Sequence, residues 1–205
     1  PDFFTRSFVA DGRVMVPRPE TEHLVEVVMR RTRRLSLSAR ILDVCTGSGC
    51  VAITLKKERP TNDIWAGDVS ADALAVARHN ADRLGALVAF RRGDLLSLGA
   101  LPRFDTICAN PPYIPSADLA GLPADVRDFE PRLALDGGED GLDTIRQLIA
   151  TAPAQLRPGG VVALEIEAGS SERVGALFED AGYGDIHVER DYAGHDRIVS
   201  ASWRR

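Results

Sequence analysis

The chain has 205 residues, of which 44% are hydrophobic and 27% are charged, and its formal net charge is −5. These proportions are those of a soluble globular protein with one sizeable core, and no stretch is long and apolar enough for a membrane span. The mildly acidic charge argues against a surface dedicated to nucleic acid.

The cysteines and histidines bear on redox state and metal binding. Cys45, Cys50 and Cys108 lie in or beside apolar runs and are odd in number, which favours reduced thiols in a cytoplasmic protein. No pair of Cys or His residues has the spacing of a zinc site, so we expect no metal.

Residues 1–38 predict a hairpin and a helix that lead into a catalytic unit of residues 39–205. Short runs at residues 6–9 and 13–16 flank a turn and form the predicted hairpin. Pro17-Arg18-Pro19 then introduces a helix, whose apolar positions recur at helical spacing up to an arginine-rich end at residues 30–34. Cations stabilise a helix C-terminus, so we interpret this cluster as a solvated helix end rather than a site for an acidic partner. Residues 36–38 are a short link.

From residue 39 onward, short apolar runs alternate with helical patterns. The predicted parallel strands are residues 40–44, 63–67, 88–92, 104–109 and 160–166. The predicted helices are residues 50–58, 71–84, 142–156 and 171–181. The last two predicted strands, 186–190 and 197–203, are separated by only a short turn and must pair antiparallel. The sequence therefore predicts an α/β fold with a mostly parallel seven-stranded sheet, covered by helices on both faces and ending in an antiparallel hairpin.

The tetrapeptide Asn110-Pro111-Pro112-Tyr113 follows the apolar run 104–109, so it lies at the carboxyl end of a buried strand, where open parallel sheets bind ligands. The Asn110 side-chain oxygen and the Pro111 carbonyl are two acceptors, which suit a substrate NH2 group. The prolines stiffen the loop, and Tyr113 offers a flat face to a planar amide or base. A simple strand-ending Pro-Pro turn is the alternative, but the full tetrapeptide at this position favours chemistry. The long polar segment 115–141 is expected to form a lid or loop beside the site.

Three other strand ends carry residues suited to a nucleoside. Residues 43–50 join the first parallel strand to a helix, and their glycines let a ligand approach the backbone, but the third glycine of a dinucleotide fingerprint is missing. Asp68 ends the second strand, where an acid accepts ribose hydroxyls, and Asp94 follows the third, where it can accept the adenine amino group. Either acid could instead cap a helix. An adenosine without a phosphate clamp, next to a cradle for an NH2 group, predicts S-adenosylmethionine as the cofactor.

Five stretches of the chain resemble the release factor glutamine methyltransferases, the HemK/PrmC family of protein-(glutamine) methyltransferases. The stretches are residues 16–22, 41–50, 110–113, 129–135 and 137–143. The resemblance implies a Rossmann-like S-adenosylmethionine-dependent methyltransferase fold. It implies cofactor contacts at Cys45, Thr46, Gly47, Ser48, Gly49, Asp68, Asp94, Leu95 and Asn110. It also implies that Asn110, Pro111, Pro112 and Tyr113 hold the substrate glutamine, which in family members is the Gln of the Gly-Gly-Gln tip of a class-1 release factor.

The resemblance also bears on domains and partners. Family members carry a helical N-terminal domain ahead of the hairpin, and we expect this domain to be absent here. A related branch that methylates a glutamine of a ribosomal protein shares the Asn-Pro-Pro-Tyr element, but residues 17–22 look more like the release-factor branch. We expect a cytoplasmic monomer that acts on a release factor, forms S-adenosylhomocysteine as product and binds no nucleic acid.

Asn110, Pro111 and Tyr113 are the expected catalytic residues. An amide nitrogen is a poor nucleophile, and two acceptors on its hydrogens orient it and stabilise the positive charge that grows on it. The proton can leave afterwards, so no strong general base is required. Arg18, Thr21 and Glu22 either close over the methionine end of the cofactor or simply start the helix.

Two other functions compete with this interpretation. Amino methyltransferases that act on adenine or cytosine use a similar motif, but they extrude a base and usually carry a basic target-recognition domain. The net charge of −5 and the absence of a spare domain speak against them. A non-catalytic cofactor-binding module is the second alternative, and the intact Asn-Pro-Pro-Tyr element gives it no support.

Overall fold

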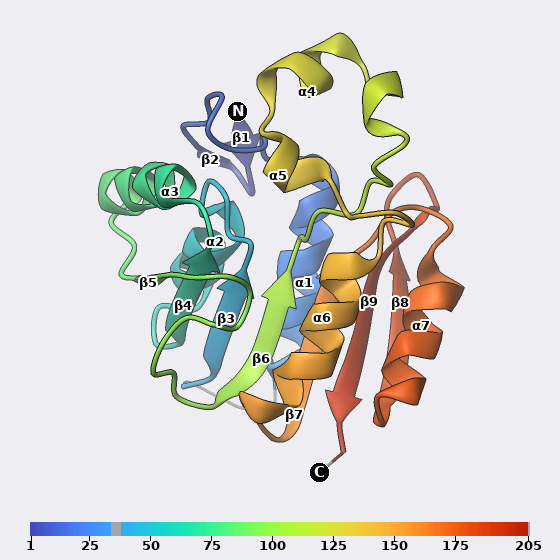
Figure 1. Cartoon of the computed structure of the whole chain (residues 1–205). Coiled ribbons are helices and arrows are strands. Elements are labelled where there is room, and N and C mark those ends of the chain that lie inside the picture. The colour runs from blue at the N-terminus through green and yellow to red at the C-terminus, as the bar shows by residue number, and fades with distance from the viewer. Residues whose placement is uncertain (34–37, 205) are drawn as a thin grey trace.

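A seven-stranded sheet runs through the computed structural model, which describes residues 1–33 and 38–204 (Figure 1). Its strands are β3 (Arg40–Val44), β4 (Asp63–Asp68), β5 (Ala89–Arg92), β6 (Phe104–Ala109), β7 (Leu156–Glu165), β8 (Tyr183–Arg190) and β9 (Asp196–Trp203). Their order is β5-β4-β3-β6-β7-β9-β8, with parallel pairing from β5 through β7. Strand β9 pairs antiparallel with both β7 and β8. The predicted α/β fold with its C-terminal antiparallel hairpin is therefore confirmed.

Helices cover both faces of the sheet, because consecutive strand residues point to opposite sides. Ile107 of β6 packs in the apolar cluster of α6 and α7, whereas its neighbour Cys108 packs in the cluster of α1 and α2. The helices are α1 (Glu22–Arg31), α2 (Cys50–Glu58), α3 (Ala71–Leu84), α4 (Ala124–Phe129), α5 (Arg132–Leu135), α6 (Asp143–Thr151) and α7 (Ser171–Asp180). None of the described helices combines the length and the apolar character that a membrane crossing requires.

The N-terminal hairpin lies earlier in the chain than predicted. It consists of β1 (Asp2–Phe3) and β2 (Arg6–Ser7), and the predicted strand over residues 13–16 is wrong. The backbone N–H of Val9 donates to Asn80 Oδ1, and Asn80 Nδ2 donates back to the Val9 carbonyl. Because the Asn80 side chain of α3 satisfies the backbone N–H and carbonyl of Val9, these groups do not require a partner strand at residues 13–16.

The predicted helix over residues 142–156 is too long. Helix α6 ends at Thr151, the 3-10 helix η4 (Ala152–Ala154) follows, and β7 begins at Leu156. Pro153 has no N–H to continue the helical ladder, and its ring obstructs the preceding turn. Strand β7 therefore starts earlier than the predicted strand 160–166.

The arginine-rich end of α1 is paired within the fold. Arg30 lies 2.5 Å from Glu189, and Arg31 lies 2.9 Å from Asp185, both acids belonging to β8. The interpretation of a purely solvated helix end is wrong for these two side chains, which hold α1 against the C-terminal hairpin. Arg34, and residues 36–37 of the predicted link, lie outside the described residues.

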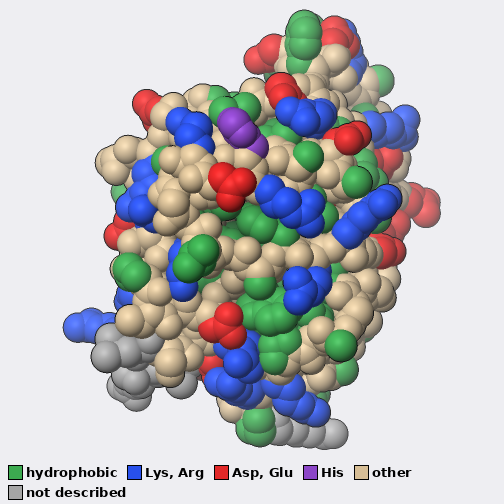
Figure 2. Space-filling view, turned by 90° about the vertical axis from the view of Figure 1, so that its left-hand side faces the viewer, with side chains coloured by type: hydrophobic (Ala, Val, Ile, Leu, Met, Phe, Trp, Pro, Cys, Tyr) green, Lys and Arg blue, Asp and Glu red, His purple; other side chains and the backbone are tan. Residues whose placement is uncertain are grey.

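Strand β5 forms one edge of the sheet. The Arg91 guanidinium lies 4.6 Å from the centre of the Trp65 ring, and that of Arg78 on α3 lies 5.8 Å from the Phe90 ring. Figure 2 shows the molecule from the side of α3 and β5, where basic, acidic and hydrophobic side chains are interspersed. Cations stacked on aromatic rings at an open edge disfavour pairing with another sheet.

Candidate active site

A cavity of about 170 Å³ opens at the carboxyl ends of β3, β4 and β6. The loop from β3 into α2 forms one wall, and residues of segment 13–21 and of α5 form another. The predicted site residues that line the cavity are Cys45, Thr46, Gly47, Ser48, Asp68, Asp94, Leu95, Asn110 and Pro112. Gly49, Pro111 and Tyr113 are not among the described residues that line it.

The two glycines of the β3–α2 loop have different surroundings. Both have positive φ, 53° at Gly47 and 81° at Gly49. A Cβ at Gly47 would meet no atom within 4 Å, so open space faces its backbone. A Cβ at Gly49 would come within 2.9 Å of Ile53 Cδ1 and 3.1 Å of Ala77 Cβ. Gly47 therefore leaves room for a ligand, whereas Gly49 leaves room for the packing of α2 against α3.

Asp68 ties the end of β4 to this loop. One carboxylate oxygen accepts the Gly47 N–H at 2.9 Å, and the other accepts the Ser70 N–H at 2.9 Å. Burial raises the pKa of Asp68, and the backbone hydrogen bonds partly offset that effect. Each carboxylate oxygen has more than one lone pair, so both can still accept a hydroxyl from the cavity.

Asp43, at the end of β3, is a residue to which sequence reasoning assigned no separate role. Its side chain is buried, and it accepts the Thr46 hydroxyl at 2.6 Å. Burial raises the pKa of Asp43 to about 7, and the Thr46 hydrogen bond counteracts this. The signal in the sequence is an acid inside an apolar strand, which is costly to bury without a partner.

Asn110 lies at the cavity wall, and its amide nitrogen is paired with the residue before α1. Asn110 Nδ2 donates to Thr21 Oγ1 at 3.2 Å. Within the described residues, neither Asn110 Oδ1 nor the Pro111 carbonyl accepts a hydrogen bond. Asn110 Oδ1 is therefore available in the cavity to a ligand that brings an NH2 group, and the Pro111 carbonyl is a second unpaired acceptor next to it in the chain.

Glu165, at the end of β7, lies behind this motif. It is 1% exposed, and its Oε1 accepts the Tyr113 hydroxyl at 3.2 Å. Burial raises the pKa of Glu165 to about 7, while hydrogen bonds from Thr21 and Tyr113 lower it. Sequence reasoning missed Glu165, although a lone acid ending an apolar strand was a signal of the same kind as Asp43.

Of the three residues with two predicted roles, Thr21 lines the cavity, whereas Arg18 and Glu22 make structural contacts. Glu22 accepts the Phe4 N–H at 2.7 Å, which joins α1 to the hairpin. Arg18 lies 2.5 Å from Glu130, whose side chain is buried. The ion pair of Arg18 and Glu130 holds the 115–141 segment to the start of α1.

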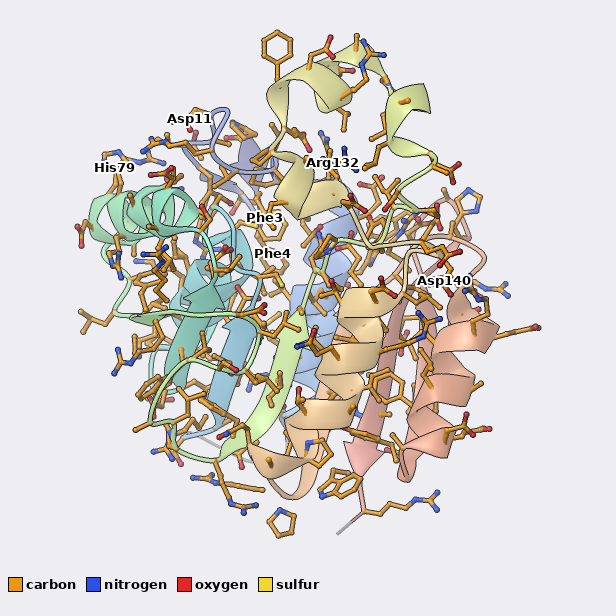
Figure 3. The ribbon with its side chains drawn as sticks, in the orientation of Figure 1. Phe3, Phe4, Asp11, His79, Arg132 and Asp140 are labelled. Atoms are coloured by element: carbon orange, nitrogen blue, oxygen red, sulfur yellow. The ribbon has the colours of Figure 1, made fainter. Side chains whose placement is uncertain are left out.

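The 115–141 segment contains three short helices, η3 (Leu119–Gly121), α4 and α5, above the carboxyl ends of the strands (Figure 1). Pro131, Leu133 and Ala134, at and just before α5, line the cavity. Figure 3 shows Arg132 on α5 above the sheet, and Asp140 beside α6 and α7. Asp140 lies 2.5 Å from both Arg146 and Arg173, which anchors the end of the segment. The expected position of this segment beside the site is confirmed.

The cavity has the chemistry that S-adenosylmethionine requires. Asp68 and Asp94 offer carboxylate oxygens to ribose hydroxyls and an adenine amino group, and Leu95 offers an apolar surface. Arg13, at the cavity wall, lies 2.6 Å from Asp11, which neutralises its charge. The site therefore favours a nucleoside with a neutral or cationic tail over a phosphate.

The sheet order and this cavity define the class of the protein, an S-adenosylmethionine-dependent methyltransferase. The family model of the methyltransferase small domain matches residues 19–120. The crystal structure of the release-factor-specific protein-(glutamine-N5) methyltransferase from Alicyclobacillus acidocaldarius is similar, with a TM-score of 0.57 and 27% identity. That similarity covers 93% of this chain and 95% of the other.

Two curated relatives narrow the class to a family. The release factor glutamine methyltransferase of Geobacter sulfurreducens is 41% identical over 97% of this chain and 69% of its own length. That of Gloeobacter violaceus is 45% identical over 94% of this chain and 68% of its own length. The chain belongs to the release factor glutamine methyltransferase family, which confirms the resemblance noted in the sequence.

Proposed function

We propose that this protein methylates the side-chain amide nitrogen of a protein glutamine, the Gln of the Gly-Gly-Gln tip of a class-1 release factor. The observation that carries the proposal is the orientation of Asn110. Its Nδ2 donates a hydrogen bond to Thr21, and its Oδ1 is left as an acceptor at the wall of the cavity. The names of the relatives support the choice of substrate.

The chemistry follows from what these acceptors do to an amide. S-adenosylmethionine, when bound, supplies a methyl group on a positively charged sulfur. Asn110 Oδ1 and the Pro111 carbonyl accept the two amide hydrogens of glutamine, which orients the nitrogen and favours the positive charge that develops on it. The N-methylated cation is acidic and loses its proton after transfer, so the site requires no strong base. Tyr113 and Pro112 restrict the plane in which the carboxamide can lie.

We propose that Cys45, Thr46, Gly47, Ser48, Asp68, Asp94, Leu95 and Asn110 contact the cofactor. Gly49 was the ninth predicted cofactor contact, but it supports helix packing and is not among the described residues that line the cavity. Its contribution is accordingly to the shape of the loop that holds Cys45–Ser48.

We further propose that the enzyme acts in the cytoplasm as a monomer and takes a protein rather than a nucleic acid. The net charge of −5 supports this choice, since nucleic-acid binding depends on basic surface. We also propose that the described part of residues 1–38 belongs functionally to the catalytic unit. Phe3 packs in the same apolar cluster as α1 and α2, and Thr21 lines the cavity.

The test of the function is mass spectrometry of release factor after incubation with this chain and S-adenosylmethionine. A gain of one methyl group on the Gly-Gly-Gln glutamine is expected, and a release factor with alanine at that position should gain none. Parallel incubations with a ribosomal protein, DNA and RNA separate the alternatives. Labelling of any of these in preference to release factor would contradict the proposed substrate.

Replacing Asn110 tests the catalytic assignment. Asn110→Ala should slow single-turnover methylation about 10²–10³-fold, the scale of losing one aligned hydrogen-bonding group at a reacting centre. The control is Asn62→Ala, since Asn62 is a buried asparagine that precedes β4 at the amino ends of the strands and does not line the cavity. Unchanged turnover in Asn110→Ala would refute the role.

A further inference from the structure

Two segments that are far apart in the sequence cover the cavity. The N-terminal flap, residues 13–21, contributes to its lining Arg13, Val14, Met15, Pro17 and Thr21. The α5 flap, residues 130–135, contributes Pro131, Leu133 and Ala134. The sheet edge opposite them carries the proposed cofactor contacts, such as Asp68 and Asp94. A bound cofactor therefore lies between the sheet edge and both flaps.

The two flaps are joined through one buried acid, Glu130. Arg18, which precedes the 3-10 helix η1 (Pro19–Thr21), donates to Glu130 Oε1 at 2.5 Å, and the Val16 N–H donates to the same oxygen at 3.4 Å. Within the described residues, no other hydrogen bond or ion pair links the two flaps. Just outside the flaps, a Cβ at Gly12 would lie 3.6 Å from the Phe129 carbonyl oxygen, so the two backbones also approach each other there.

The pair acts on a ligand only through the flaps, because neither Arg18 nor Glu130 is among the described residues that line the cavity. The Glu130 side chain is 4% exposed, whereas that of Arg18 is 37% exposed. Burial raises the pKa of Glu130, and the charge of Arg18 counteracts this. A buried acid whose partner is removed keeps an uncompensated charge, which is strongly destabilising. Without Arg18, we therefore expect Glu130 to move toward water, which parts the flaps.

The closed arrangement leaves one oxygen of Glu130 unsatisfied, since the other accepts both hydrogen bonds. Glu130 Oε2 is buried and has no hydrogen-bond partner within the described residues. Water satisfies this oxygen once the flaps part, and that gain offsets some of the attraction between Glu130 and Arg18. The contact can therefore break and re-form, as exchange of a cofactor beneath two flaps requires.

We infer that Arg18 and Glu130 are positioning residues that hold the two flaps closed over the cofactor. The pair preorganises the cavity, because a ligand that meets joined flaps does not have to order them. It also slows release, since the ligand leaves only when the flaps part. The inference concerns retention of the cofactor and does not depend on which substrate is methylated.

Binding of S-adenosylhomocysteine tests the pair without any turnover. In Arg18→Met, the dissociation constant measured by calorimetry should rise about 3–10-fold, because the flaps are no longer preorganised. The dissociation rate, measured by chasing labelled ligand with an excess of unlabelled ligand, should rise as well. Arg18→Lys keeps a cation for this single contact and should recover most of the affinity. A wild-type dissociation constant and dissociation rate in Arg18→Met would overturn the inference.

A matched ion pair separates this role from a general loss of stability. Arg157 lies 2.8 Å from Asp105 near the start of β6, and their side chains are 43% and 9% exposed. Neither residue is among the described residues that line the cavity. Arg157→Met should lower the free energy of unfolding in urea, as Arg18→Met does, but it should leave the binding of S-adenosylhomocysteine unchanged. Equal weakening of binding in the two variants would contradict a role specific to the flaps.

A double-mutant cycle shows whether Arg18 and Glu130 act as one pair. Glu130→Gln keeps the size of the side chain but removes its charge, and it should also weaken the binding of S-adenosylhomocysteine. The double variant should bind within about twofold of Arg18→Met alone, since the second change removes an interaction that is already lost. Losses of binding free energy that add in the double variant would show that the two residues act independently, which would overturn the inference.

Discussion

Acids at the ends of three strands illustrate how neighbours decide the role of one residue type. Asp43, the residue before the last one of β3, accepts a hydrogen bond from the Thr46 hydroxyl, and Glu165, the last residue of β7, accepts one from the Tyr113 hydroxyl. Asp68 ends β4 and accepts two backbone N–H groups while it lines the cavity. All three acids organise the surroundings of the site, and Asp43 and Asp68 also line the cavity, whereas Glu165 does not.

Asp68→Asn should weaken binding of S-adenosylhomocysteine by about 1.5–3 kcal/mol, the scale of a hydrogen bond to a charged group. The amide keeps one acceptor oxygen for one of the two backbone N–H groups, but its NH2 group faces the other, that of Gly47 or of Ser70, which then lacks an acceptor. Isothermal titration calorimetry measures the loss. Asp82→Asn, at an exposed position of α3, makes the same chemical change away from the cavity and should leave the affinity unaltered. Equal affinities of the two variants would remove Asp68 from the site.

At the scale of elements, the two glycines of the β3–α2 loop, Gly47 and Gly49, serve different purposes. Gly49 is the residue before α2, and its missing Cβ allows α2 to approach Ala77 of α3. Gly47 has the same left-handed backbone but faces open space. Gly49 therefore allows the close packing of α2 and α3, and Gly47 leaves space for a ligand.

Alanine at each glycine should separate these demands. Gly49→Ala should lower the free energy of unfolding by about 2–4 kcal/mol, because the positive φ and the contact with Ile53 both oppose a Cβ. Gly47→Ala should cost only about 1–2 kcal/mol from its φ, but it should weaken cofactor binding more than Gly49→Ala does, since Gly47 lines the cavity and Gly49 does not. Urea unfolding and calorimetry with S-adenosylhomocysteine measure the two effects. The reverse order in both measurements would show that the glycines have been assigned the wrong roles.

Elements with a strong local signal could be predicted, and those decided by distant contacts could not. The strand over residues 104–109 and the helices over 50–58 and 71–84 match β6, α2 and α3, because apolar pattern and flanking residues agree there. The hairpin was misplaced because Val9 bonds to Asn80, 71 residues further along the chain. Likewise the contact of Thr21 with Asn110 spans 89 residues, and no local pattern encodes it.

For the molecule as a whole, buried and exposed acids have opposite effects on how the free energy of unfolding changes with pH. Burial raises the pKa of Asp43 and of Glu165 to about 7, above the usual values for unfolded acids. Surface acids such as Asp140 have a pKa lowered to about 2, chiefly by a hydrogen bond from Arg146. Their stabilisation is present above pH 4 and is lost as pH falls toward 2, so it is constant over the range in which the two buried acids titrate.

In Asp43→Asn, the free energy of unfolding should therefore decrease less steeply with rising pH than in wild type. A raised folded-state pKa means that the folded chain holds the proton more tightly than the unfolded chain. The stabilisation from protonated Asp43 is complete below about pH 4 and is lost as pH rises through about 7. The free energy of unfolding, measured with urea between about pH 5 and about pH 8, should fall more steeply in wild type than in Asp43→Asn. A constant offset from the lost Thr46 contact does not affect this comparison, which concerns the slope alone. Asp82→Asn should run parallel to wild type, and a parallel course for Asp43→Asn as well would mean that Asp43 is ionised in the folded protein throughout this range.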